Sequence, residues 1–354
     1  MTTAVPLIYS FPEFSGVAEA VADLIVTAQN KALSKSHDEN SNTNTTNNSS
    51  SVSSLSNNNN LINSNINSSQ INNSSPNIIT NNINSIQQRN TSQLDSSIQD
   101  SNNNNIHSNL MSTSPSTGSQ IRKKKKENNK RFKIGISGGS LLNVLNEGLL
   151  KRNDIKWDKW DIYFADERLV PFDSLESNYG QAKSKLFDKI PIENGKPNIF
   201  PINKNLLNDP QECADDYEKT LIQGFASKDS VKLPLFDLIL LGCAPDGHVA
   251  SLFPNHETLR EQYAWCVPVE NSPVGPLNRI SLSVPVICHS HMVAFVVEGS
   301  TKAPVLSTIM ERPDKGLPAS IINEKAAGKI AWFVDDDAIS DVVGITKKRY
   351  KFTA

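Results

Sequence analysis

An imidazole and a carboxylate lie two residues apart in DLILLGCAPDGHVASLFP, which spans residues 237–254. An imidazole near neutral pH can take a proton from water or pass one to a leaving group, so His248 is a candidate general base. Pro245 and Gly247 favour a sharp bend that lifts His248 out of the preceding apolar run. Asp246 has a competing structural interpretation, in which its carboxylate caps the turn that follows.

A carboxylate and a guanidinium follow a second apolar run, WDIYFA at residues 160–165. We expect Asp166 to orient an imidazole or a hydroxyl group. We expect Arg168 to bind an anion, because the guanidinium presents a planar fork of donors. The alternative is an ion pair at a strand end that takes no part in chemistry.

A glycine pair follows a third apolar run, FKIGIS at residues 132–137, and precedes a helical pattern. A Gly-rich turn between a strand and a helix exposes backbone N–H groups that attract an anion such as phosphate. The turn formed by Ser137, Gly138, Gly139 and Ser140 is therefore a candidate phosphate site. It matches neither GxGxxG nor a Walker loop, so the alternative is a tight turn that needs Gly for its backbone geometry.

The elements that must position these three turns form an alternating series from Phe132 onward. Runs that are apolar on both faces alternate with helical patterns, which predicts an α/β fold with a doubly wound, mainly parallel sheet and helices on both faces. Residues 279–287 are expected among the strands, and an amphipathic helix with Ser15 as its N-cap is expected over residues 14–34. Ligands of such folds bind beyond the carboxyl ends of the strands, where the three turns would meet.

A segment rich in Asn and Ser runs from about Ser36 to Gln120 and is followed by the basic run Arg122 to Arg131. Its composition offers too little apolar surface to offset the entropy of ordering the backbone, which predicts disorder. We therefore divide the chain into three parts. They are the N-terminal part of the folded domain (1–35), a disordered insertion that ends in the basic run (36–131) and the main body (132–354).

Composition narrows the setting of the protein. Its 354 residues include 35 Lys and Arg and 37 Asp and Glu, and the net charge of −2 gives no overall attraction to nucleic acid or an anionic membrane. No apolar run reaches the length of a membrane helix and no secretory signal is recognisable, which predicts a soluble protein without a membrane partner. The cysteines lack CxxC spacing, and His289 and His291 would share one face of a strand without a third ligand, so we expect no metal site.

Several ordered motifs resemble the 6-phosphogluconolactonase family, which is related to the glucosamine-6-phosphate isomerases. The resemblance covers the N-terminal helix and Phe132 to about Asp337, and it is closest to the fungal Sol group, some of whose members are lactonase-like proteins linked to tRNA function. The motifs are SGGS at 137–140, ADERLVP with SNY at 165–171 and 177–179, LLGCAPDGHVASLFP at 240–254, NRISLSVPVI, GSTKAPVL and LPAS.

The resemblance implies hydrolysis of 6-phosphoglucono-1,5-lactone to 6-phosphogluconate in the oxidative pentose phosphate pathway. It implies that His248 is the base that activates water, that Asp166 helps to position it and that Arg168 contacts the substrate. The SGGS turn, Arg279 and Lys302 would hold the phosphate of this sugar phosphate lactone. The resemblance implies no cofactor and no metal.

Three positions depart from the usual family pattern. Ala244 stands in place of Gly, where a methyl group would strain a backbone with positive φ. Val274 stands where Lys is common. The SGGS turn continues as SLL, without the Pro that pre-forms a helix start.

Two other functions stay open at this point. One is a catalytically weak or inactive lactonase-like protein with a binding or regulatory role linked to tRNA processing or nuclear export. Its partners, tRNA or nuclear transport factors, would contact the basic run Arg122 to Arg131. The other is an isomerase or deaminase of an amino sugar phosphate, because the related family shares the Gly-rich turn. The expected location is the cytoplasm, and the basic run adds the nucleus as an alternative.

Overall fold

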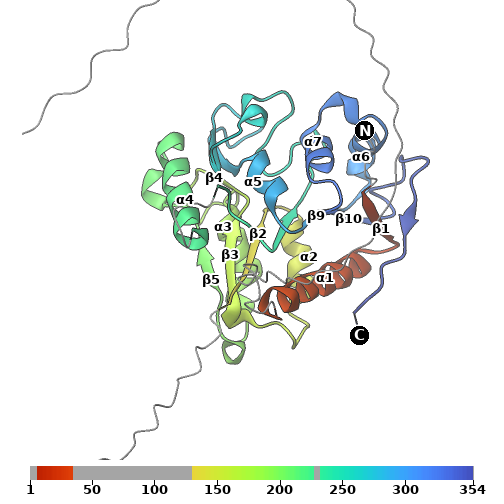
Figure 1. The fold of residues 1–354 in the computed structure, drawn as a ribbon, viewed down its shortest axis with the longest axis horizontal. Coiled ribbons are helices and arrows are strands. Elements are labelled where there is room, and N and C mark those ends of the chain that lie inside the picture. Colours follow the sequence, from red (N-terminus) through yellow and green to blue (C-terminus); the bar gives the residue numbers. More distant parts are fainter. Residues whose placement is uncertain (1–5, 35–129, 227–231, 354) are drawn as a thin grey trace, which may run out of the picture. The chain divides into compact units, whose positions relative to one another are not determined.

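The computed structural model describes residues 6–34, 130–226 and 232–353 (Figure 1). The proposed insertion thus lies outside the described residues, apart from Lys130 and Arg131 at its end. The helices are α1 (Phe14–Ser34), α2 (Leu141–Leu149), α3 (Asn178–Lys185), α4 (Pro210–Phe225), α5 (Val284–His289), α6 (Ala303–Glu311) and α7 (Pro318–Lys325). The strands are β1 (Leu7–Phe11), β2 (Phe132–Ile136), β3 (Trp160–Phe164), β4 (Asp166–Arg168), β5 (Asn198–Phe200), β6 (Leu238–Leu241), β7 (Cys266–Val269), β8 (Arg279–Leu282), β9 (Val293–Val297), β10 (Ile330–Asp335) and β11 (Lys347–Lys348).

The main sheet contains eight strands in the order β11-β1-β10-β9-β6-β2-β3-β5, and all of its pairings are parallel. The central strands are buried along their whole length, as in LILL of β6 and VAFVV of β9. Side chains that are apolar on both faces are what a sheet covered on both sides requires. The predicted α/β fold with a mainly parallel sheet is confirmed. Strand β1, which the sequence analysis did not identify, extends the sheet beyond β10.

Helices cover both faces of this sheet, as predicted for a doubly wound fold. One core cluster joins α1, α2 and α3 to one face, through residues such as Ile134 and Leu240. The other joins α4, α5, α6 and α7 to the opposite face, through residues such as Ile239 and Phe295. Because successive side chains of a strand point to opposite faces of the sheet, the neighbours Ile239 and Leu240 pack into different core clusters.

The chain reverses its winding between β2 and β6, which are neighbours in the sheet. After β2 it continues into α2 on one face, and after β6 it leads toward α5 on the other face. Adjacent loops that diverge in this way leave a crevice at the carboxyl edge of the sheet. The turn at 137–140 and the loop that carries His248 flank that crevice.

A second sheet of three antiparallel strands, β4-β8-β7, follows the carboxyl end of β3. Asp166 pairs with Ser281 and Arg168 with Arg279. The expectation that 279–287 forms one strand is wrong, because the strand ends at Leu282 and α5 begins at Val284 with Pro285 in its first turn. A proline there is tolerated, since its missing N–H has no partner within the helix.

Helix α1 and Arg131, which precedes β2, are both anchored to the start of β3 and to the residues just before it. The Gln29 side chain accepts hydrogen bonds from the Trp160 indole and the Lys156 N–H, each at 2.8 Å. Arg131 donates to the Asp161 carboxylate at 2.6 Å and to the Trp160 carbonyl at 2.6 Å. Arg131, the last cation of the basic run, is therefore bound to the folded body.

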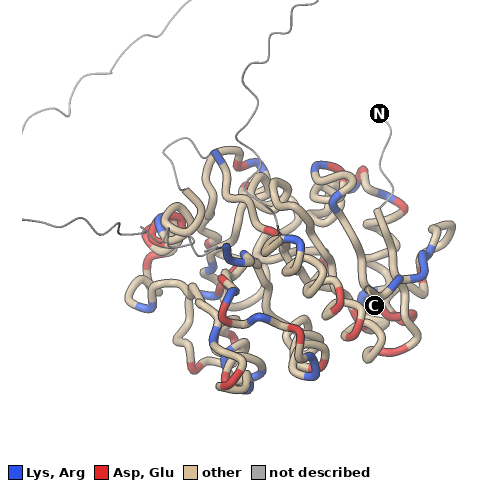
Figure 2. Tube along the Cα trace, turned by 60° about the horizontal axis from the view of Figure 1, so that its bottom comes forward, with Lys and Arg blue, Asp and Glu red and all other residues tan. Residues whose placement is uncertain are grey.

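Charged residues of both signs are interspersed along the chain trace (Figure 2). Within the described ranges, we find no helix with the length and apolar character needed to cross a bilayer.

Helices α1 and α2 lie side by side (Figure 1) and approach closely at Gly148 of α2. A Cβ atom at Gly148 would lie 2.3 Å from the carbonyl oxygen of Ala18 in α1. No L side chain fits this contact unless the helices separate. Helix α1 itself begins at Phe14, so the predicted N-cap at Ser15 is wrong.

We expect the substitution Gly148→Ala to lower the free energy of unfolding by about 1–3 kcal/mol, because overpacking outweighs the ~1 kcal/mol by which Ala favours a helix. The matched control is Asn143→Ala at an exposed position of the same helix. It should leave stability unchanged or raise it slightly. Urea denaturation measures both, and a stabilised Gly148→Ala variant would contradict the close helix contact.

Candidate functional site

A cavity of about 230 Å³ lies at the carboxyl edge of the sheet, beside the crevice between β2 and β6. It collects the three turns singled out in the sequence, together with the loop after β9. The lining residues are Ser137, Gly138, Gly139, Ser140, Asp166, Arg168, Asn178, Gly242, Cys243, Ala244, His248, Ala250 and Lys302. Of the nine predicted site residues, Arg279 does not line this cavity.

His248 is held by its neighbour Asp246. The Nδ1 atom of His248 lies 2.7 Å from the Asp246 carboxylate, which also accepts the backbone N–H of His248 at 3.2 Å. The imidazole packs against the Phe253 ring with 4.5 Å between centroids, and 15% of its side chain is exposed. A carboxylate on Nδ1 favours the tautomer with its proton there, which leaves Nε2 as the basic nitrogen.

Burial lowers the pKa of His248, and the Asp246 carboxylate opposes this shift. Arg279 adds a smaller lowering, because a nearby cation disfavours imidazolium. His248 is therefore neutral near pH 7, the form that a general base requires.

The loop that carries His248 tolerates Ala244 without backbone strain. The residues of this loop with positive φ are Gly247 at +88° and Ala250 at +52°, and Ala244 is not one of them. The Ala244 N–H donates to the His248 carbonyl at 3.0 Å, which closes the turn. The methyl group at 244 thus avoids the left-handed strain considered from the sequence.

The Asp166 carboxylate is buried and shared between two hydroxyl groups. Ser137 donates to one oxygen at 2.9 Å, and Ser251 donates to the other at 2.8 Å. The Arg168 Nε lies 4.0 Å from the second oxygen. No hydrogen bond joins Asp166 to His248 in the part of the chain that the structure describes. The sequence predicted that Asp166 orients an imidazole or a hydroxyl group, and the structure shows it bound to two hydroxyls. The resemblance implied that Asp166 helps to position the base, whereas the described contact with the imidazole comes from Asp246.

Glu167, between the two predicted site residues, fixes the start of α3. Its carboxylate accepts the backbone N–H groups of Asn178 and Tyr179 at 2.7 Å and that of Arg168 at 2.8 Å. Burial raises the pKa of Glu167 to about 7, although the three N–H groups act in the opposite direction. Glu167 thus helps to hold its neighbours Asp166 and Arg168 in place.

The diglycine turn presents backbone amides at the N-terminus of α2. In the described ranges, the N–H groups of Gly138, Gly139 and Ser140 have no hydrogen-bond partner. Gly139 has φ of +75°, and a Cβ at Gly138 would lie 1.9 Å from the Asn178 side-chain oxygen. Both glycines are therefore required by geometry, and the free amides face a position where an anion is favoured.

Two cations border the same cavity. Arg168 donates to the Glu176 carbonyl at 2.8 Å, which leaves other guanidinium donors available. Lys302 lies in the loop after β9, and burial lowers the pKa of its ammonium group. The cavity therefore combines free amides, an ammonium and a guanidinium.

Arg279 does not line the cavity but contacts a neighbouring loop. Only 1% of the residue is exposed, and its guanidinium donates to the carbonyls of Val274, Gly275 and Pro276 at 2.7–3.0 Å. It therefore supports the 274–276 loop and acts on His248 through its charge. The Val274 side chain is 44% exposed, and its carbonyl is one of these acceptors.

Sequence reasoning missed Ser251, Asn178 and the role of Asp246. Ser251 and Asn178 fall inside the motifs quoted above, yet only the folded chain brings them to Asp166. No group of three or more His, Cys, Asp or Glu side chains in the described ranges is arranged to hold a metal ion. His289 and His291 do not share a strand, because His289 ends α5.

Several known proteins are similar to this chain in sequence or fold. The family profile described as glucosamine-6-phosphate isomerases/6-phosphogluconolactonase matches residues 97–332. The chain is 55% identical to 6-phosphogluconolactonase-like protein 1 of Saccharomyces cerevisiae, over 99% of this chain and 98% of that protein. It is 44% identical to a probable 6-phosphogluconolactonase of Schizosaccharomyces pombe, over 64% and 90%. The solved structure of the devB protein is 32% identical with a TM-score of 0.52, over 60% of this chain and 88% of that one.

We expect Asp246→Asn to lower the pKa of His248 further, because the substitution removes the anion that favours imidazolium. Titration of the imidazole by NMR measures this change. Asp188→Asn, which alters an exposed carboxylate outside the cavity, should leave the pKa of His248 unchanged. An unchanged or higher pKa in Asp246→Asn would contradict the described contact.

Proposed function

The chain belongs to the family of glucosamine-6-phosphate isomerases and 6-phosphogluconolactonases, and we propose that it hydrolyses 6-phosphoglucono-1,5-lactone to 6-phosphogluconate. The observation that carries this proposal is the arrangement around His248. A neutral imidazole, held through Nδ1 by Asp246, borders the same cavity as three free amides and Lys302.

In the proposed reaction, Nε2 of His248 removes a proton from water as the oxygen of that water attacks the lactone carbonyl carbon. The tetrahedral intermediate then expels the ring oxygen, which takes the proton back from His248. The ester C–O bond breaks and the products are a carboxylic acid and a hydroxyl group. Asp246 stabilises the transient imidazolium, as a carboxylate on Nδ1 does in other acid–base sites.

The phosphate of the substrate would lie at the N-terminus of α2. The amides of Gly138, Gly139 and Ser140 can donate to its oxygens, and Lys302 supplies an opposing charge. Arg168 is positioned for a second contact with the substrate. Because free amides and cations bind one end while the imidazole acts at the other, the site separates recognition from chemistry.

The geometry supports a lactonase over an isomerase. Isomerisation of a sugar phosphate requires a base that removes a proton from carbon, and the candidate carboxylate in this cavity is Asp166. Both of its oxygens already accept hydroxyl hydrogen bonds, from Ser137 and Ser251. An ester needs only activated water and a base, which His248 can provide.

A lactonase assay on the full chain tests the proposal. We expect His248→Ala to lower kcat by about 10²- to 10⁴-fold, because the variant lacks the general base. The rate of the unmodified protein should decline as the pH falls through the lowered pKa of His248, since imidazolium cannot accept a proton.

The matched control is His256→Ala, which alters an imidazole that bonds to Thr258 outside the cavity. Its rate should equal that of the unmodified protein. Lactone opening no faster than the spontaneous reaction, or full activity in His248→Ala, would refute the proposed function.

A second candidate role is RNA binding, and the observation that favours it is the cation cluster from Arg122 to Arg131. Arg131 is engaged with Asp161, so the role would depend on the preceding residues. Replacing Arg122–Lys126 by Ser should weaken association with tRNA and reduce its salt dependence, because fewer counterions are released. Replacing Lys347 and Lys348 is the control. If association with tRNA is unchanged after the first replacement, the basic run has no part in RNA binding.

A further inference from the structure

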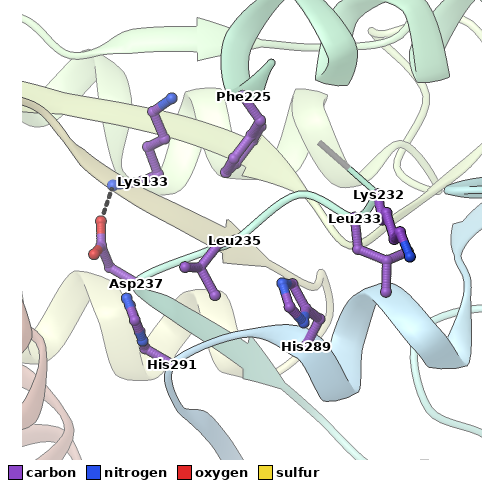
Figure 3. A pocket seen from close by; sticks show the side chains of 8 residues that line it. All are labelled: Lys133, Phe225, Lys232, Leu233, Leu235, Asp237, His289 and His291. Carbon is purple, nitrogen blue, oxygen red and sulfur yellow. Dashed lines mark hydrogen bonds between the residues drawn. The ribbon is translucent and has the colours of Figure 1, made fainter. Parts of the chain in front are cut away.

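A second cavity, of about 690 Å³, lies at a distance from the candidate site and shares no lining residue with it (Figure 3). It is larger than the 230 Å³ cavity beside His248. A volume of several hundred Å³ is typical of cavities that bind small organic molecules. The proposed lactonase reaction makes no use of it.

The second cavity lies at the amino edge of the main sheet. Lys133 is near the start of β2, Leu235 and Asp237 precede β6, and His289 ends α5. Because β2 and β6 are parallel, the diglycine turn and the His248 loop lie at the opposite ends of the same two strands. A molecule bound here would not compete directly with a substrate at the carboxyl edge.

Part of the wall is apolar and held in place. Figure 3 shows the Leu235 side chain in the middle of the group, near the Phe225 ring. Phe225 is packed against Tyr163 and Phe236 with 5.2 Å and 4.6 Å between ring centroids. Leu235 is 41% exposed, so its side chain is accessible to a molecule in the cavity. This wall suits a ring or another apolar body.

In the same view the ammonium group of Lys133 lies above Leu235 and that of Lys232 lies to its right. Lys133 donates to the Gly224 carbonyl and lies 4.4 Å from the centre of the Phe225 ring. That hydrogen bond uses one of its three N–H donors. Burial lowers the pKa of Lys133, so an anion beside it would relieve the cost of keeping the ammonium charged. Lys232 is exposed.

His289 adds a polar group that an anion can also use. Burial and the nearby Lys329 both lower the pKa of His289, which is therefore neutral and able to donate one N–H. The carboxylate of Asp237 accepts the backbone N–H of Lys133 at 2.9 Å, so it braces the strand edge. Two lysines against one aspartate leave the lining with a positive balance.

From these features we infer that the amino-edge cavity binds a small organic anion in which a phosphate or carboxylate is joined to an apolar ring. The head group would contact Lys232 and His289, and the ring would lie on Leu235 and Phe225, with Lys133 adding positive charge to the same lining. Apolar walls with a few convergent polar groups are the usual composition of such sites.

Isothermal titration calorimetry of the full chain tests this inference with three probes: adenosine 5′-monophosphate, 3-phenylpropanoate and inorganic phosphate. We expect at least one ring anion to bind saturably and inorganic phosphate to bind more weakly. Lys232→Ala and His289→Ala should each weaken that binding about tenfold, since each removes a donor to the anion. Leu235→Asp should abolish it. These three side chains are exposed enough for their replacement to leave the fold intact.

Two variants separate this cavity from the rest of the surface. Lys302→Ala alters the candidate active site and should keep the binding of the ring anion, and Lys348→Ala on β11 should also keep it. Binding that is lost in Lys302→Ala but retained in Lys232→Ala would place the probe in the lactonase cavity and overturn the inference. The absence of saturable binding, or equal affinity for inorganic phosphate, would overturn it as well.

Discussion

One buried carboxylate connects the loops on which the candidate site depends. Asp166, in the strand that follows β3, accepts a hydroxyl hydrogen bond from Ser137 after β2 and another from Ser251 after β6. A buried carboxylate is costly unless each oxygen has a partner, so the three loops are held in one relative position. The parallel sheet brings the loops to one edge, and Asp166 fixes them there.

This arrangement gives the two halves of the cavity different electrostatic properties. At one end the amides of α2 and Lys302 favour negative charge. At the other end burial keeps His248 neutral, while the contact of Asp246 with Nδ1 leaves Nε2 as the basic nitrogen. A site with these two ends can hold a phosphate ester by its charged group and still offer a base to a neutral carbonyl. This combination of a phosphate-binding end and a neutral base is the reason for the proposed lactonase reaction.

Much of this could be predicted from sequence, because the central strands are apolar on both faces and the polar turns directly follow them. The positions of Ser137–Ser140 and His248 required only that the carboxyl ends of parallel strands share an edge. Side-chain partners were harder to predict. Asp246 lies two residues from His248, yet its carboxylate had an equally plausible local use as a cap. The family resemblance implied that Arg279 holds phosphate, but its hydrogen bonds to the carbonyls of its own loop could not be read from the sequence.

The anchoring of Gln29 and Arg131 to the segment around Trp160 has a consequence for how this chain can diverge. Both contacts lie at the amino edge of the sheet, so the two anchors are on the side away from His248. A change in chain length between the two anchors therefore acts at the edge of the sheet opposite to the cavity that His248 lines. We therefore expect the length and composition of the chain between Gln29 and Arg131 to vary independently of the residues that line the cavity beside His248.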